Sequence, residues 1–74
     1  MDFPTKDFRI QLIIHDLKQQ QVADRLGVHK AEVSMVVNNS RQTYRIRKFL
    51  DLVLREMQSG KFTRLEDYDP DRLF

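Results

Sequence analysis

The sequence predicts an all-α fold, a compact domain of four to five helices. Apolar residues recur at helical spacing near the N-terminus and again, for three turns, between residues 46 and 57. Between these two stretches, a single glycine separates two short apolar segments. The chain has 74 residues and no cysteine. Its core must therefore come from packed helices, from a partner chain or from both, without a disulfide or a thiolate metal site.

The first expected helix covers residues 6–17. Its apolar stripe is formed by residues at positions i, i+3, i+4 and i+7, namely Ile10, Ile13, Ile14 and Leu17. Thr5 is the expected N-cap. Asp7 falls in the first turn, where the helix dipole favours a negative charge.

Two short helices are expected next, over residues 19–26 and 30–37. Gly27 should end the first of them by taking the left-handed conformation. Ala23 has to be small because the second helix crosses close to it, and Val28 fills the corner. Three residues of each helix should face the core: Val22, Ala23 and Leu26, then Val33, Val36 and Val37. Two short helices crossed at such a turn form a helix-turn-helix, here at residues 19–38.

A longer helix follows the breaker cluster Asn38-Asn39-Ser40. Thr43 is its candidate N-cap and Gly60 its expected stop. Its buried stripe is predicted to be Ile46, Phe49, Leu50, Val53, Leu54 and Met57. The character of the chain changes after Gly60, which divides a domain at 1–60 from an arm at 61–74. The arm is expected to be either a short helix over Leu65 and Tyr68 or an extended segment.

Positive charge is concentrated in one part of the chain. Residues 18–48 hold seven basic and two acidic residues, a local net charge of +5, whereas the remainder sums to −3 within a total of +2. Such a distribution is expected of a protein with one polyanion-binding face, although an ordinary solvated surface is the alternative. The longest apolar run, at residues 12–14, is far too short to span a membrane. The N-terminus lacks the apolar core of a secretory signal, so a cytoplasmic location is the default expectation.

Residues 19–38 resemble the helix-turn-helix of the lambda-repressor-like (Cro and XRE type) DNA-binding domains. The resemblance, with flanking helices, covers roughly residues 6–57. Two positions depart from the family pattern: His29 replaces a small polar residue before the recognition helix, and Asn39 replaces the usual glycine. The matching residues are Gln19, Val22, Ala23, Leu26, Gly27, Val28, Val33, Ser34, Val36 and Asn38. The resemblance implies a double-stranded DNA partner, with helix 30–37 in the major groove.

The residues expected to read base edges follow from the buried valines of that helix. Lys30 can donate to guanine O6 and N7, and Ala31 or Met35 can contact a thymine methyl group. Glu32 could accept from cytosine N4, or it could simply favour the helix dipole. Ser34 faces the same side, where it could contact a base or only permit close approach. The candidate base-reading residues are Lys30, Ala31, Glu32, Ser34 and Met35.

Phosphate contacts are expected on both sides of that helix. The resemblance implies that Gln19 binds a phosphate through its side chain and its backbone amide. The loop and helix start that follow would lie against the DNA backbone, through Asn38, Ser40, Arg41, Thr43, Tyr44 and Arg45. Arg47 and Lys48 are weaker candidates, since both could merely decorate the long helix.

An enzyme is not expected. The neighbouring residues His15 and Asp16 diverge on a helix, and neither a phosphate-binding glycine loop nor metal-ligand spacing is present. The sequence suggests no cofactor, metal or small-molecule ligand. The main alternative is a protein-interaction module, such as an adaptor or an antitoxin-like partner. Against that alternative, the face of residues 30–38 carries few large apolar residues, and a basic loop follows it.

A homodimer is expected because one short helix reads only a few base pairs, and paired half-sites raise the affinity. The outer face of the long helix is one candidate interface. The others lie in the arm, where the alternative is that they fold back onto their own core: Phe62, Leu65, Tyr68, Leu73 and Phe74. The chain is expected to be a short regulator without a sensor domain, and in this it resembles phage or prophage repressors and Cro-like switches.

Overall fold

The structure, a computed structural model, describes residues 2–72. Within that range, the all-α prediction is confirmed. The chain forms α1 (Thr5–Ile14), α2 (Gln19–Leu26), α3 (Lys30–Val37), α4 (Tyr44–Gln58) and two 3-10 turns, η1 (Leu65–Asp67) and η2 (Pro70–Arg72). None of the helices in the described range is long and apolar enough to cross a membrane.

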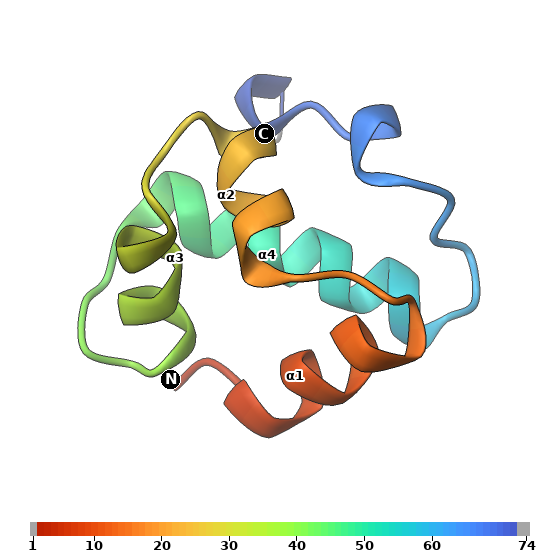
Figure 1. Cartoon of the computed structure of the whole chain (residues 1–74), viewed down its shortest axis with the longest axis horizontal. Coiled ribbons are helices and arrows are strands. Elements are labelled where there is room, and N and C mark those ends of the chain that lie inside the picture. Colours follow the sequence, from red (N-terminus) through yellow and green to blue (C-terminus); the bar gives the residue numbers. More distant parts are fainter. Residues whose placement is uncertain (1, 73–74) are drawn as a thin grey trace.

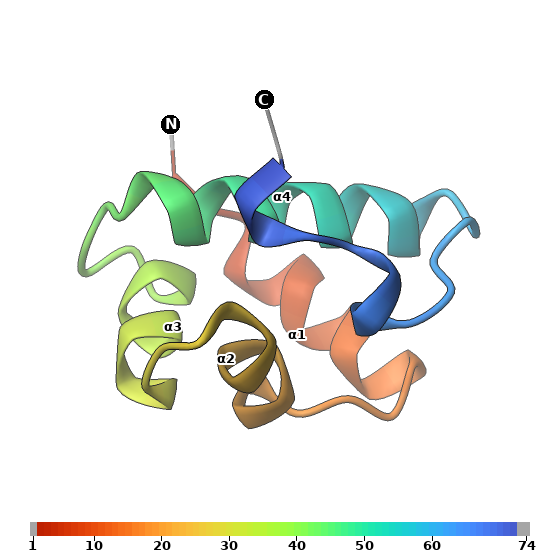
Figure 2. The same cartoon turned by 90° about the horizontal axis from the view of Figure 1, so that it is seen from above.

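Helix α4 is the element around which the others are arranged. In Figure 1 it runs behind α2 and α3, and α1 lies along the lower edge. Seen from above in Figure 2, α4 occupies one side of the molecule and α2 and α3 the other. α2 packs closely against α3, and α4 contacts both α1 and α3. All six residues of the predicted α4 stripe are at most 5% exposed, which confirms that prediction.

The predicted buried face of α1 is wrong for three of its four residues, whereas the fourth, Leu17, packs against the core. Ile10, Ile13 and Ile14 are 47%, 78% and 65% exposed. The helix instead buries Phe8 and Leu12, at 0% and 5% exposure. Both sets of residues have helical spacing, so periodicity alone could not choose between them.

The ends of α1 also differ from the prediction. Pro4 takes the N-cap position, and Thr5 is already helical. The Thr5 hydroxyl donates to the carbonyl of Val37, at the end of α3, instead of capping its own helix. At the other end, Asp16 adopts a left-handed φ of 54°. The helix therefore stops at Ile14, and Leu17 donates its N–H back to the carbonyl of Leu12 over 2.8 Å.

The turn between α2 and α3 forms as predicted. Gly27 follows α2 with a φ of 74°, and the N–H of Val28 donates to the carbonyl of Ala23 over 3.0 Å. Ala23 itself is completely buried. A Cβ atom at Gly27 would meet no neighbour within 4 Å. Glycine is thus favoured here by its backbone conformation and not by lack of space.

The connection into α4 depends on a second left-handed residue. Asn39 has a φ of 62°, in the left-handed region that asparagine tolerates better than most other non-glycine residues. Thr43 occupies the N-cap position of α4, but its side chain makes no capping hydrogen bond. α4 ends at Gln58, two residues before Gly60, whose φ is 77°.

Of the two conformations expected for the C-terminal segment, the short helix is the closer, because Leu65–Asp67 form η1 and Tyr68 follows as its C-cap. The segment turns back through η1 and η2 and packs on the core, as the fold-back alternative predicts. Leu65 is only 4% exposed, and the ring of Phe62 stacks on that of Tyr68 with 5.6 Å between the centroids. Arg25 links the segment to α2 by hydrogen bonds, because its Nε donates to the carbonyls of Leu65 and Tyr68. Leu73 and Phe74, also named as candidate interface residues, lie outside the described residues.

A side-chain cluster stabilises η1 locally. The Thr63 hydroxyl donates to Asp67 Oδ2 over 2.6 Å, and Arg64 Nε donates to Asp67 Oδ1 over 3.2 Å. These bonds, the one from Thr63 first, lower the pKa of Asp67 below its ordinary value. The ionised Asp67 therefore stabilises the folded chain at pH values above its ordinary pKa. This stabilisation is lost as the pH falls through the lowered pKa of the folded state.

Candidate nucleic-acid interface

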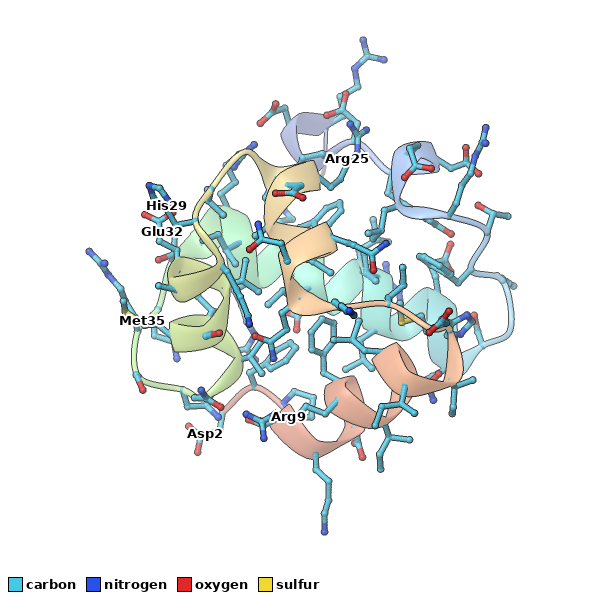
Figure 3. The ribbon with its side chains drawn as sticks, in the orientation of Figure 1. Asp2, Arg9, Arg25, His29, Glu32 and Met35 are labelled. Carbon is cyan, nitrogen blue, oxygen red and sulfur yellow. The ribbon has the colours of Figure 1, made fainter. Side chains whose placement is uncertain are left out.

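The outer face of α3 carries the residues expected to read bases. Val33, Val36 and Val37 are at most 1% exposed and turn toward the core. The opposite face is open, with Lys30, Ala31 and Met35 exposed and Ser34 half-buried. Figure 3 shows Met35 on the outer side of the helix. The division into faces that the sequence predicts is therefore present.

The side chains of Ser34 and Gln19 bind each other. Ser34 Oγ donates to Gln19 Oε1 over 2.8 Å, which joins the first residue of α2 to the outer side of α3. The bond consumes the oxygen of the Gln19 amide. The Gln19 Nε2 group has no hydrogen-bond acceptor within residues 2–72. It is therefore available to donate a hydrogen bond to a bound ligand. Ser34 acts here as a link between the two helices.

Glu32 has a local structural role. Its carboxylate accepts from the backbone N–H of His29 over 3.2 Å, the reciprocal half of a capping box. Figure 3 shows the two side chains next to each other at the start of α3. Of the two interpretations of Glu32, the structure therefore supports stabilisation of the helix start. His29, the residue that departs from the family pattern, is simply the N-cap of α3.

Arg9 joins the candidate interface although the sequence did not single it out. Its Nη2 donates to Asn38 Oδ1 over 3.0 Å, and both side chains are exposed. The bond occupies the Asn38 oxygen, so the amide nitrogen of Asn38 is the group left to donate. Figure 3 shows Arg9 on α1, between that helix and the lower end of α3. No sequence signal could have placed it there, because the two residues are 29 positions apart and meet only after folding.

Asn39 holds the N-terminal segment against the end of α3. Its Oδ1 accepts from the N–H of Phe3 over 2.6 Å, and its Nδ2 donates to the carbonyl of Phe3 over 3.0 Å. The ring of Phe3 is 2% exposed and packs edge-on against Phe8. A glycine at position 39 would allow the same backbone conformation but not this pair of bonds.

The loop after α3 presents exposed polar groups beside the helix. Both Ser40 and Arg41 donate their backbone N–H to the carbonyl of Met35, at 2.8 and 3.2 Å, so the loop is pinned to the end of α3. Their side chains remain exposed, whereas Thr43 is half-buried. Tyr44 is 74% exposed and its hydroxyl accepts from Lys48 Nζ over 3.0 Å. Lys48 thus brings a positive charge to Tyr44.

Arg45 and Arg47 are engaged elsewhere in the chain. Arg45 Nη1 donates to the carbonyl of Leu26 over 2.9 Å, and its Nε pairs with Asp71 Oδ1 over 2.9 Å. Arg47 pairs with Asp51 over 3.1 Å. Its guanidinium also lies 5.2 Å from the centroid of the Phe3 ring. A carboxylate thus partly neutralises each guanidinium, which sets both residues apart from Arg41.

A second surface feature lies away from α3. An open pocket of about 570 Å³ is lined by the connection from α1 to α2, by α2 and by the C-terminal segment. His15, on its wall, lies edge-on to the ring of Phe62, with 5.1 Å between the centroids. Arg25, also on the wall, is committed to backbone carbonyls of the C-terminal segment. Among residues 2–72 there is no cluster of three or more His, Cys, Asp or Glu side chains that could hold a metal ion.

Comparison of the chain with protein-family models, with curated proteins and with solved structures finds no match.

Proposed function

We propose that the protein is a sequence-specific regulator of transcription that binds double-stranded DNA with α3 in the major groove. The observation that carries the proposal is the outer face of α3. Its residues are small or slender, and cations flank it: Arg9 from α1 and Arg41 from the following loop. A helix with a narrow, polar outer face suits the major groove, which is wide enough to admit one.

Base recognition in this proposal belongs to three side chains. Lys30, exposed at the start of α3, donates to guanine O6 and N7. Ala31 and Met35 supply apolar contacts for thymine methyl groups. The small side chain of Ser34 allows the helix to approach the bases closely and positions Gln19 through a hydrogen bond. Glu32 stabilises the N-terminus of α3.

Phosphate binding belongs to donors from four elements. Gln19 Nε2 and the N-terminus of α2 bind one phosphate, in a geometry that helix N-termini favour. The amide of Asn38, held by Arg9, binds another. The next phosphates of the DNA strand that Asn38 contacts are bound by the loop, through Ser40 and Arg41, and by the start of α4, through Thr43 and Tyr44. Arg45 joins them only after it leaves Asp71.

The proposed biological role is repression in a bacterial or phage-infected cell. The protein would act in the cytoplasm, where such DNA lies, as a homodimer on paired half-sites. Regulation would depend on concentration and operator occupancy, without a cofactor. The basis for this part of the proposal is the resemblance of residues 19–38 to the helix-turn-helix of lambda-repressor-like DNA-binding domains.

The test is selection from a pool of randomised duplexes, followed by sequencing and by titration at several salt concentrations. We expect an enriched sequence motif. Lys30→Ala should relax specificity at one or two base positions and cost about 1–3 kcal/mol at those positions. Arg41→Ala should weaken binding to every sequence equally and lower the salt slope by about one unit.

The matched control is Lys61→Ala, which removes an exposed lysine outside residues 18–48 and the α3 surface. It should change neither specificity nor salt slope appreciably. Failure to bind any duplex at low salt would exclude the proposal. The α3 face would then be tested as the docking surface of a protein partner, the second candidate function.

A further inference from the structure

The imidazole of His29 is exposed at the start of α3 and has no partner in the fold. The backbone of His29 takes the N-cap position, and its N–H donates to the Glu32 carboxylate over 3.2 Å. The ring itself makes no hydrogen bond, ion pair or ring contact within residues 2–72. The N-cap position therefore accounts for the backbone of His29 and leaves its side chain available to a ligand.

The other histidine of the chain has a different environment. His15 is half-buried and lies edge-on to the ring of Phe62, on the wall of the open pocket away from α3. Histidine is the side chain whose charge ordinarily changes between about pH 5 and 8. The two histidines thus place one such group on the surface assigned to DNA and a second, for comparison, elsewhere.

The charges around His29 do not commit its ring to one charge state. The elements that meet at this turn carry equal numbers of cations and carboxylates: Lys30 and Glu32 in α3, Asp24 and Arg25 in α2, Arg45 in α4 and Asp71 in η2. None of them forms an ion pair with His29. A phosphate brought to this point by DNA would therefore be an added, uncompensated negative charge beside the ring.

We propose that protonated His29 binds a DNA phosphate at the N-terminal end of α3, so that DNA binding takes up a proton. This inference rests on the proposed function, which places α3 in the major groove between the two sugar–phosphate backbones. His29 has an extended backbone, with a ψ of 148°, so the chain leaves the helix there and its side chain can reach the wall of the groove. The neutral ring can also donate a hydrogen bond, but only the protonated ring adds a charge that offsets the phosphate.

The expected pH dependence has one direction. The protonated ring strengthens binding, so DNA affinity should be highest at low pH and should fall as the pH rises toward 8. We expect a fall of roughly three- to tenfold between about pH 5.5 and pH 8, with at most one proton taken up. The added phosphate contact should also make the salt slope steeper by about one unit at the lower pH.

The test titrates the full chain with the duplex enriched by selection, at both pH values and at several salt concentrations. Calorimetry in two buffers of different ionisation heat counts the protons taken up. His29→Asn should remove both the pH dependence and the change in salt slope, and asparagine is itself a preferred N-cap residue. His29→Arg should bind without pH dependence and keep the steeper salt slope at both values, because its charge is permanent. The matched control, His15→Asn, should behave as the wild type does.

Three results would overturn the proposal. The first is a wild-type affinity that does not change with pH. The second is a pH dependence that survives in His29→Asn or disappears in His15→Asn. The third is a pH dependence without a change in salt slope, which would assign the ring to a base edge and not to a phosphate.

Failure of this inference is distinguishable from failure of the proposed function. If the chain binds its enriched duplex equally well at both pH values, the role of His29 fails and the proposed function stands. If no duplex binds at low salt at either pH, the proposed function fails and this inference fails with it.

Discussion

Two residues adopt the left-handed conformation for different reasons, one in the turn of the helix-turn-helix and one just after it. Gly27, with a φ of 74°, has space around it, so only its backbone conformation disfavours other residues. Asn39, with a φ of 62°, adds two hydrogen bonds to Phe3. The first position thus needs a permissive residue, and the second needs a permissive residue with a specific side chain.

Gly27→Ala should therefore destabilise the protein by about 1–2 kcal/mol, the cost of a left-handed alanine. Gly27→Asn should cost less, because asparagine tolerates this region better. Urea unfolding followed by circular dichroism measures both. Equal losses for the two variants would show that something other than backbone conformation is lost.

Asn39→Gly removes the side-chain bonds to Phe3 but keeps the backbone conformation easy to reach. We expect a loss of about 1–2 kcal/mol from the buried partners left without bonds. Asn39→Ala should cost more, because it adds backbone strain to the same loss. The comparison uses unfolding free energies, and the prediction fails if Asn39→Gly is as stable as the wild type.

At the scale of single helices, α2 to α4 could be predicted from sequence and α1 only in part. The glycine turn and the long apolar stripe identify α2, α3 and α4 and their buried faces, because each has one apolar side. α1 has apolar residues on both sides, and the choice between Phe8 and the isoleucines is made by the rest of the fold. Its end was missed because Asp16, not glycine, supplies the left-handed residue.

The two interpretations of Glu32 predict opposite results for Glu32→Ala. If Glu32 only caps the helix, Glu32→Ala should lower the free energy of unfolding by about 0.5–1 kcal/mol. Its loss should also raise affinity for all duplexes at low salt, since a negative charge leaves the surface. Binding measurements on a panel of operator variants check this, and loss of discrimination at one C·G pair would instead assign base reading to Glu32.

At the scale of the whole molecule, the C-terminal segment closes over the core and brings carboxylates toward basic residues. Asp71 pairs with Arg45, which is bonded as well to the end of α2. The sequence could locate the excess of basic residues at 18–48. It could not show that Asp71, outside this range, pairs with Arg45 and offsets part of that charge. That pairing depends on a chain reversal 26 residues later, just as the Arg9 contact depends on how α1 meets α3.

Asp71→Asn should accordingly increase DNA affinity and raise the salt slope by about one unit, because Arg45 becomes available to a phosphate. Asp69→Asn is the matched control, with the same change of charge in the same segment but a pairing to Arg72. Salt-dependent titrations of a fixed duplex measure both. Equal effects of the two substitutions would indicate general electrostatics and no specific role for Arg45.

The bonds between Asn39 and Phe3 have a practical consequence for how the protein is handled. They fix the point where the chain enters the fold, beside the end of α3, and Figure 3 labels Asp2 at the lower left, below α3. The segment before α1 lies on the side of the molecule that α4 occupies (Figure 2), so a polypeptide joined ahead of Asp2 would begin there. An affinity tag at that end is therefore joined one residue from the two hydrogen bonds that Asn39 makes with Phe3, so unfolding measurements are best made on the chain without it.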